Sequence, residues 1–188
     1  MRRFVAICAV FVVAAAGLTL AQDKPAAPPA QQKPPASPPA VTMISIDGKA
    51  IGIKYSAPSV RGRDMFGAGG VISKDRTYPV WRLGANSATA LHTEADLDIK
   101  GLAVPKGDYT LFAQVDATPW QLIVSKQTGE WGLAYSKDQD LGRVPMEMSK
   151  PPSLIETCKL TLSTMGPAGG KLVVEFENFV ASVTFTAK

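Results

Sequence analysis

Hydrophobic and polar residues alternate with a period of two along most of the chain beyond residue 40, and no stretch carries a sustained helical stripe. Residues 51–55 alternate in this way directly after Asp47-Gly48, a dipeptide typical of tight β-hairpin turns. Residues 109–115 are apolar on both faces, which predicts a buried central strand. Further alternating runs occupy residues 153–163, 171–177 and 179–185.

Strands of this length, separated by Gly, Pro, Asn and Asp about every ten residues, predict an all-β fold. We expect a single antiparallel β-sandwich, jelly-roll-like, over residues 41–188. In the run 153–163 the inward face is expected to carry Leu154, Cys158, Leu160 and Leu162. Residues 137–152 are ambiguous, and a short helix near residues 144–149 remains open.

The first 21 residues have the pattern of a signal peptide. Met1-Arg2-Arg3 is a positively charged start, residues 4–20 are uncharged and apolar, and Thr19-Leu20-Ala21 ends in a small residue. The alternative is an uncleaved membrane anchor, but the apolar run is short for a span of about 20 residues. The sequence therefore predicts cleavage before Gln22 and export to the periplasm or the exterior.

Residues 22–40 differ from the rest of the chain in composition. They hold seven of the 15 prolines and no large apolar residue, so they cannot bury enough surface to offset the entropy of ordering. We expect an extended, disordered Pro/Ala-rich tether between the signal peptide and the folded domain.

The net charge and the cysteine content limit which partners and which covalent cross-links the protein can have. Removal of residues 1–21 takes away Arg2 and Arg3 and lowers the net charge from +4 to +2. This is too little to predict binding to nucleic acid or to an anionic membrane surface. Cys158 is then the single remaining thiol, which excludes an intrachain disulfide and is expected to be a buried strand residue. No transmembrane span is expected in the mature protein.

Residues 80–89 contain several polar and aromatic side chains that could contact a ligand. Trp81 offers a stacking face, Arg82 a fork of donors for a carboxylate or phosphate, Asn86 an amide and Thr89 a hydroxyl. Together with Arg63, these are the candidate ligand-binding residues, and their chemistry suits a small anionic or sugar-like ligand. The alternative is structural, with Trp81 in the core, Arg82 paired with an acid, and Asn86 shaping a turn.

Three ordered motifs resemble signatures of domain-of-unknown-function family 2911. They occupy residues 55–67 (YSAPSVRGRDMFG), 81–89 (WRLGANSAT) and 105–112 (PKGDYTLF). The similarity continues through Trp120 and Trp131-Gly132 and covers roughly residues 41–185. The family consists of exported bacterial proteins without an established activity. The resemblance therefore implies the compartment and the extent of the fold, and no mechanism.

Candidate chemistry elsewhere is sparse. Asp96 and Asp98 would share one face of a strand, and with Glu94 they could support acid/base chemistry. His92 is the single imidazole, so we expect no metal site. The glycine-rich residues 66–70 lack the Lys-Ser/Thr ending of a phosphate loop, and no cofactor is expected.

These observations favour a non-catalytic binding or interaction module of the cell envelope, whose partner is a small ligand or an envelope protein. The alternatives are an envelope hydrolase that uses Glu94, Asp96 or Asp98, and a purely structural domain.

Overall fold

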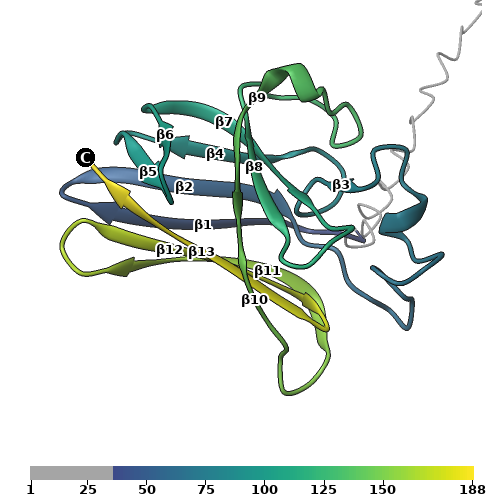
Figure 1. The fold of residues 1–188 in the computed structure, drawn as a ribbon. Helices are drawn as coiled ribbons and strands as arrows, with labels where there is room; N and C mark the ends of the chain where they lie inside the picture. The colour runs from purple at the N-terminus through teal and green to yellow at the C-terminus, as the bar shows by residue number, and fades with distance from the viewer. Residues whose placement is uncertain (1–35) are drawn as a thin grey trace, which may run out of the picture. The chain divides into compact units, whose positions relative to one another are not determined.

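The computed structural model describes residues 36–188 (Figure 1). The predicted signal peptide, and the predicted tether up to residue 35, lie outside the described residues. Within residues 36–188, no helix combines the length and hydrophobicity that crossing a bilayer requires. The helical segments of this part are two single 3-10 turns, Ile72–Lys74 and Lys137–Gln139.

Two antiparallel sheets form the described part of the chain and face each other as two layers (Figure 1). The first sheet contains, in spatial order, β1 (Pro39–Ile46), β2 (Lys49–Ser56), β4 (Thr89–Thr93), β7 (Gly107–Gln114), β8 (Gln121–Ser125) and β9 (Asp140–Pro145), with β3 (Val80–Trp81) paired to β7. The second contains β11 (Ile155–Met165), β12 (Gly169–Glu177), β13 (Phe179–Ala187), β5 (Leu97–Ile99) and β6 (Leu102–Val104), with β10 (Glu147–Ser149) paired to β13. The predicted all-β antiparallel sandwich is confirmed.

The predicted hairpin and central strand are also confirmed. Asp47 and Gly48 both have positive φ, 50° and 75°, as a two-residue turn that matches the strand twist requires. The turn pairs Ile46 with Lys49 and sets the register of β1 against β2. Strand β7 lies between β4 and β8; Leu111 faces the core and Phe112 is covered on the other face by Ile123 and Tyr135, which explains the apolar residues on both faces.

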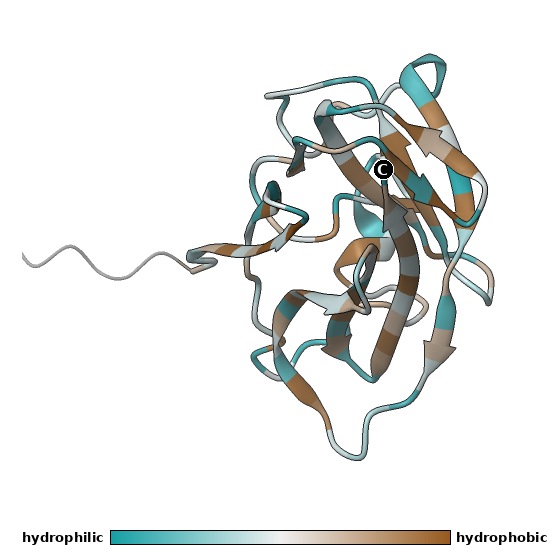
Figure 2. Ribbon diagram, turned by 90° about the vertical axis from the view of Figure 1, so that its left-hand side faces the viewer, coloured by the Kyte–Doolittle hydropathy of each residue, from teal (hydrophilic) through white to brown (hydrophobic). Residues whose placement is uncertain are grey.

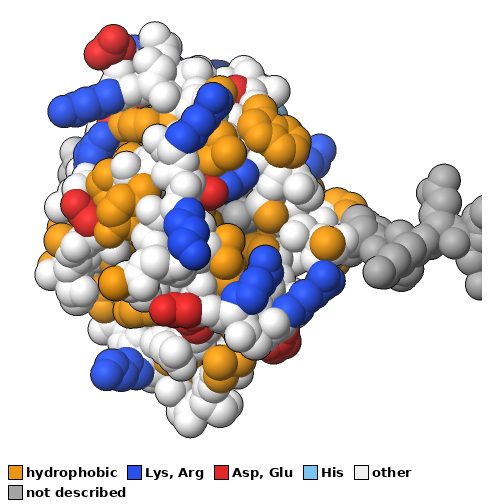
Figure 3. Space-filling model, turned by 90° about the vertical axis from the view of Figure 1, so that its right-hand side faces the viewer, with side chains coloured by type: hydrophobic (Ala, Val, Ile, Leu, Met, Phe, Trp, Pro, Cys, Tyr) orange, Lys and Arg blue, Asp and Glu red, His pale blue; other side chains and the backbone are white. Residues whose placement is uncertain are grey.

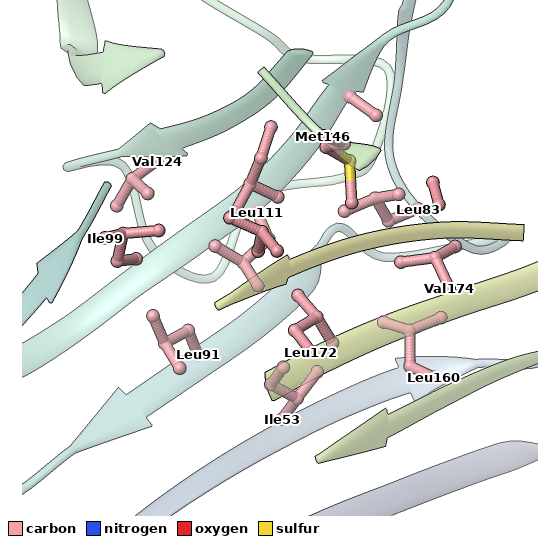
Figure 4. Packing of buried hydrophobic residues seen from close by; sticks show 14 of the residues in the cluster. Ile53, Leu83, Leu91, Ile99, Leu111, Val124, Met146, Leu160, Leu172 and Val174 are labelled. Carbon is pink, nitrogen blue, oxygen red and sulfur yellow. The ribbon is translucent and has the colours of Figure 1, made fainter. Parts of the chain in front are cut away.

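The core lies between the two sheets. Figure 4 shows Ile53, Leu91 and Leu111 of the first sheet packed toward Leu160, Leu172 and Val174 of the second. Alternating brown and teal bands along the strands in Figure 2 show the same two-residue period that the sequence carries. Complete burial of each such side chain contributes about 1.5–3 kcal/mol.

Side chains join the edges of the two sheets. The backbone N–H of Leu162 in β11 donates to Thr42 Oγ1 in β1 at 2.9 Å, and that of Leu160 donates to the Tyr55 hydroxyl at 3.1 Å. These bonds satisfy edge groups that would otherwise be open to pairing with another chain.

Two local expectations need correction. No helix forms near residues 144–149, because Val144 pairs with Leu122 in the first sheet and Met148 pairs with Ala181 in the second. Leu154 is 51% exposed and lies before the start of β11, rather than on its inward face. The pairing of β11 with β12 shifts between residues 155 and 159, which interrupts the alternation.

Candidate functional site

Four of the five candidate residues lie on the turn between β3 and β4 or at its two ends, and two of them are buried. Trp81 is 2% exposed, donates from its indole nitrogen to the Gly84 carbonyl at 3.2 Å, and stacks on Phe176 with ring centroids 6.0 Å apart. Thr89 is 0% exposed and donates from Oγ1 to the Leu83 carbonyl at 3.1 Å. Both side chains are therefore buried structural residues that hydrogen-bond to backbone carbonyls of the turn.

Arg82 and Asn86 connect this turn to neighbouring segments of the chain. Arg82 Nη2 contacts Asp75 Oδ2 at 2.5 Å, and Nη1 donates to the Asn86 carbonyl at 3.4 Å. The same carbonyl accepts the N–H of Gly132 at 3.1 Å. Asn86 has a φ of 59°, a conformation that asparagine tolerates better than most residues. The turn therefore anchors the 126–136 loop, which connects β8 to the 3-10 turn before β9.

Glycine is required where this loop meets Arg82. A Cβ on Gly132 would collide with Arg82 Cδ and lie 2.7 Å from the Asn86 carbonyl oxygen. Ser87 and Trp131 form a β-bridge, and the N–H of Ala88 donates to the Glu130 carbonyl at 3.3 Å. Residues 130–132 of the loop are therefore fixed to the turn by backbone contacts.

Arg63, the fifth candidate, lies outside this turn. It folds back on its own segment, donating to the carbonyls of Val60 at 3.0 Å and Ser59 at 2.7 Å. The structure thus brings Trp81, Arg82, Asn86 and Thr89 together and leaves Arg63 separate. That these five residues bind a ligand stays a prediction, and none of them lines the hollow described next.

A hollow of about 640 Å³ opens on the first sheet, on the face turned away from the core. We call it the sheet hollow; its lining includes Val41, Met43, Ala50, Gly52, Lys54, Ala90, His92, Asp108, Thr128 and Gly129. Two cross-strand rows line the hollow, Val41 to Lys54 to Ala90, and Met43 to Gly52 to His92 to Asp108. Small residues at positions 50, 52 and 90 leave the depression between larger neighbours.

The floor of the sheet hollow is apolar and exposed. Val41 and Met43 are 59% and 63% exposed, although both lie in an ordered strand. Single exposed apolar residues are ordinary, but two of them facing the same concave surface mark a place where a partner can remove apolar area from water.

Polar groups stand at the rim of the hollow. His92 Nδ1 and Asp108 Oδ1 are 2.8 Å apart across β4 and β7, and both side chains are largely exposed. Lys54 also lines the hollow, is exposed, and forms no ion pair with another described residue. The rim therefore combines an ammonium group that forms no ion pair with a described residue and the carboxylate of Asp108.

The 126–136 loop forms one wall of the hollow through Thr128 and Gly129. Gln127 holds its base, accepting the N–H of Ser136 at 3.0 Å and donating to the Ala134 carbonyl at 3.3 Å. Tyr135 packs edge-on against Phe112, with ring centroids 5.1 Å apart. These contacts fix the wall against the sheet.

The Tyr135 hydroxyl joins a polar cluster beside that wall. It donates to Asp140 Oδ2 at 2.9 Å and accepts from Arg143 Nη2. Burial, followed by the hydrogen bond to Asp140, raises the pKa of Tyr135 to about 12.

A second hollow of about 280 Å³ continues past Lys54, Ala90 and Gly129 to Glu130. Both carboxylate oxygens of Glu130 are buried and have no hydrogen-bond partner among the described residues. Buried carboxylates are normally satisfied, so this one can accept hydrogen bonds from water or from a ligand in the hollow.

The carboxylates considered for acid/base chemistry accept backbone hydrogen bonds, and only Asp98 among them lines one of the described hollows, a separate one of about 250 Å³ beside Lys100 and Thr184. Glu94 Oε2 accepts the N–H of Ala50 at 2.7 Å, Asp96 Oδ1 that of Lys106 at 2.8 Å, and Asp98 Oδ1 that of Gly101 at 2.7 Å. None of the three lines the sheet hollow. In residues 36–188, no three His, Cys, Asp or Glu side chains gather closely enough to hold a metal ion.

Cys158 lies on the inward face of β11, as expected. It is 1% exposed, and burial raises the pKa of its thiol. The protonated, inaccessible thiol is a core residue.

Sequence reasoning missed Lys54, Asp108, Val41 and Met43 as site residues, and treated His92 only as a metal ligand. A signal was present, because positions 41 and 43 are apolar where the alternation of β1 directs side chains away from the core. The pairing of β1, β2, β4 and β7 then gathers these positions on one face.

The fold and this surface define the protein as an all-β sandwich domain with an open, largely apolar hollow on the outer face of one sheet. The chain belongs to the family described as "Protein of unknown function (DUF2911)", whose sequence model matches residues 37–185. The family resemblance drawn from the three motifs is confirmed. No curated protein and no solved structure matches the chain significantly.

Proposed function

We propose that this protein is a non-catalytic binding module that holds a small anionic amphipathic molecule in the sheet hollow. The observation that carries the proposal is the hollow itself: about 640 Å³, with exposed Val41 and Met43 on its floor and Lys54 on its rim. Small-molecule sites are typically of this size, mostly apolar, with a few polar groups that set orientation.

The ligand class follows from the chemistry of the lining. An apolar group of the ligand would cover Val41, Met43 and Ala90, and the burial of that area supplies the main favourable free energy. A carboxylate or similar anion would then reach Lys54, whose charge has no partner among the described residues.

The polar groups support binding rather than catalysis. His92 and Asp108 pair in a largely exposed position, where water screens their charges. Glu94, Asp96 and Asp98, which a hydrolase would need free, accept backbone hydrogen bonds in turns.

We also propose that the protein works outside the cytoplasm, in the periplasm or secreted, after cleavage before Gln22. The charged start, the apolar run and Thr19-Leu20-Ala21 support this. Intact-mass measurement on protein from the native envelope is expected to give a chain that begins at Gln22; a mass that retains residues 1–21 would contradict the cleavage.

Isothermal titration with matched probes tests the proposed ligand class. Sodium decanoate is expected to bind, decylammonium to bind more weakly because Lys54 repels it, and glucose and acetate to give no heat beyond dilution. Decanoate should also raise the melting temperature in proportion to the logarithm of its excess over Kd. Equal binding of both decyl compounds would contradict the role of Lys54, and binding of glucose alone would replace the amphiphile with a sugar. No binding by any probe would favour a purely structural domain.

A further inference from the structure

The segment between β2 and β3, residues 57–79, forms a lobe of loops at one end of the sandwich, on the right in Figure 1. We call it the basic lobe. It carries four exposed basic side chains, Arg61, Arg63, Lys74 and Arg76. Asp64 and Asp75 are its acidic residues, and Asp75 is already paired with Arg82. Figure 3 shows this end of the molecule, with Lys and Arg side chains spread over the face and Asp or Glu side chains among them.

The arginines of the lobe donate hydrogen bonds to backbone carbonyls, which orient their side chains and do not neutralise their charge. Arg61 donates to the Ala36 carbonyl at 3.0 Å and Arg76 donates to the Leu133 carbonyl at 2.8 Å; Arg63 is held by carbonyls in the same way. No arginine or lysine of the lobe forms an ion pair with a described carboxylate. Side chains that are ordered before binding lose less entropy when they meet an anion.

Nearby carboxylates lower the net charge of the lobe but form no ion pair with its basic side chains. Asp64 Oδ1 accepts the N–H of Gly67 at 2.9 Å, and Glu156 Oε1 accepts the N–H of Arg61 at 2.8 Å. Both are therefore turned toward backbone amides. At the opposite end, the acidic residues Asp47, Glu94, Asp96 and Asp98 are accompanied by Lys49, Lys100, Lys106 and Lys188, so acidic and basic charges are balanced there.

Apolar side chains are exposed among these charges. Tyr78, within the lobe, is 44% exposed, and Trp131 is 55% exposed on the loop to which Arg76 is bonded. Figure 3 shows hydrophobic side chains interspersed with Lys and Arg on this face. Tyr and Trp are enriched at membrane–water interfaces, where Lys and Arg contact the lipid headgroups.

We infer that the basic lobe docks this domain onto an anionic phospholipid surface. The small net charge of the chain does not exclude such a partner, because four exposed basic residues lie within residues 57–79. Because salt screens charges over about 8 Å under physiological conditions, the local cluster decides the interaction. Arg61 also donates to the carbonyl of Ala36, the first described residue.

Sedimentation of the full chain with lipid vesicles tests the inference. Binding to vesicles of phosphatidylcholine with about one-third phosphatidylglycerol is expected to exceed binding to phosphatidylcholine alone, and to fall between about 50 and about 300 mM NaCl. Each basic residue near an anionic membrane surface contributes to the free energy of membrane binding. Lys74→Gln and Arg76→Gln should therefore each lower the partition coefficient between membrane and water about fivefold.

Two controls separate docking from folding and from net charge. Arg76→Lys keeps the charge and should retain most of the binding. Lys74→Gln removes an ammonium group that forms no hydrogen bond with a described residue, so this variant should fold as the parent does. Lys106→Gln removes the same charge at the opposite end and should bind as the parent does. Equal losses in Lys106→Gln and Lys74→Gln would overturn the inference, as would equal binding to both vesicle types. Binding to dextran sulfate without binding to phosphatidylglycerol vesicles would replace the membrane with a soluble polyanion.

Discussion

Replacing Arg82 with alanine should destabilise the fold by about 2–3 kcal/mol. The Arg82–Asp75 pair is 2.5 Å long, and its side chains are only 11% and 22% exposed. Exposed ion pairs contribute about 0–1 kcal/mol, whereas removing one partner of a buried pair costs about 3–5 kcal/mol. Arg82→Ala leaves Asp75 in a largely water-excluded place, which puts the cost between these ranges. It also removes the bond to the Asn86 carbonyl and the packing on Gly132.

Urea unfolding of Arg82→Ala, Asp75→Ala and the double variant measures this cost and its origin. The double variant should lose less than the two single losses combined, with a coupling of about 1–2 kcal/mol, because the second change removes the stranded carboxylate. Arg82→Lys keeps the charge without the two-nitrogen fork and should fall between the parent and Arg82→Ala. A loss below about 0.5 kcal/mol for Arg82→Ala would refute the anchoring role and return Arg82 to the candidates for ligand binding.

Three further outcomes follow from the same structure. Asn86→Gly should retain more stability than Asn86→Ala by about 1 kcal/mol in urea unfolding, since alanine is disfavoured at a φ of 59°; the reverse order would contradict the turn geometry. The pKa of Tyr135 is raised from about 10 to about 12, so its protonated form contributes stability below pH 10 that is lost as pH rises toward 12; Tyr135→Phe should flatten this part of the curve, and an unchanged curve would count against the cluster. The thiol of Cys158 should react with Ellman's reagent only on unfolding in urea, because it is 1% exposed; rapid reaction in the native state would contradict its burial.

The regular parts of the fold could be predicted because their signals are local. Asp47-Gly48 specifies its hairpin through backbone conformation, and the apolar run at residues 109–115 identifies the central strand β7. Residues 144–149 gave no local signal, since their strand character comes from pairing with β8 and β13. Leu154 was misplaced because the bulge at the start of β11 depends on how β12 lies against it.

The candidate site was harder to predict for the same reason. The chemistry of residues 81–89 is visible in the sequence, but whether it binds a ligand or builds a turn depends on Asp75 and Gly132, which are brought to it by folding. The sheet hollow combines positions 41 to 129, and no short motif contains them. Its floor is visible in the sequence only as apolar residues on the outward positions of β1.

The affinity of decanoate for Lys54→Met, compared with Lys106→Met, tests the binding proposal most directly. Lys54 lines the sheet hollow and Lys106 does not, while both changes remove one exposed ammonium group and keep a chain of similar length. By isothermal titration, Lys54→Met should bind decanoate about five- to tenfold more weakly than the parent, and Lys106→Met should bind it equally well. Met43→Glu, which places a negative charge on the floor, should abolish binding. Parent-like affinity in both Lys54→Met and Met43→Glu would contradict the assignment of the hollow as the binding site.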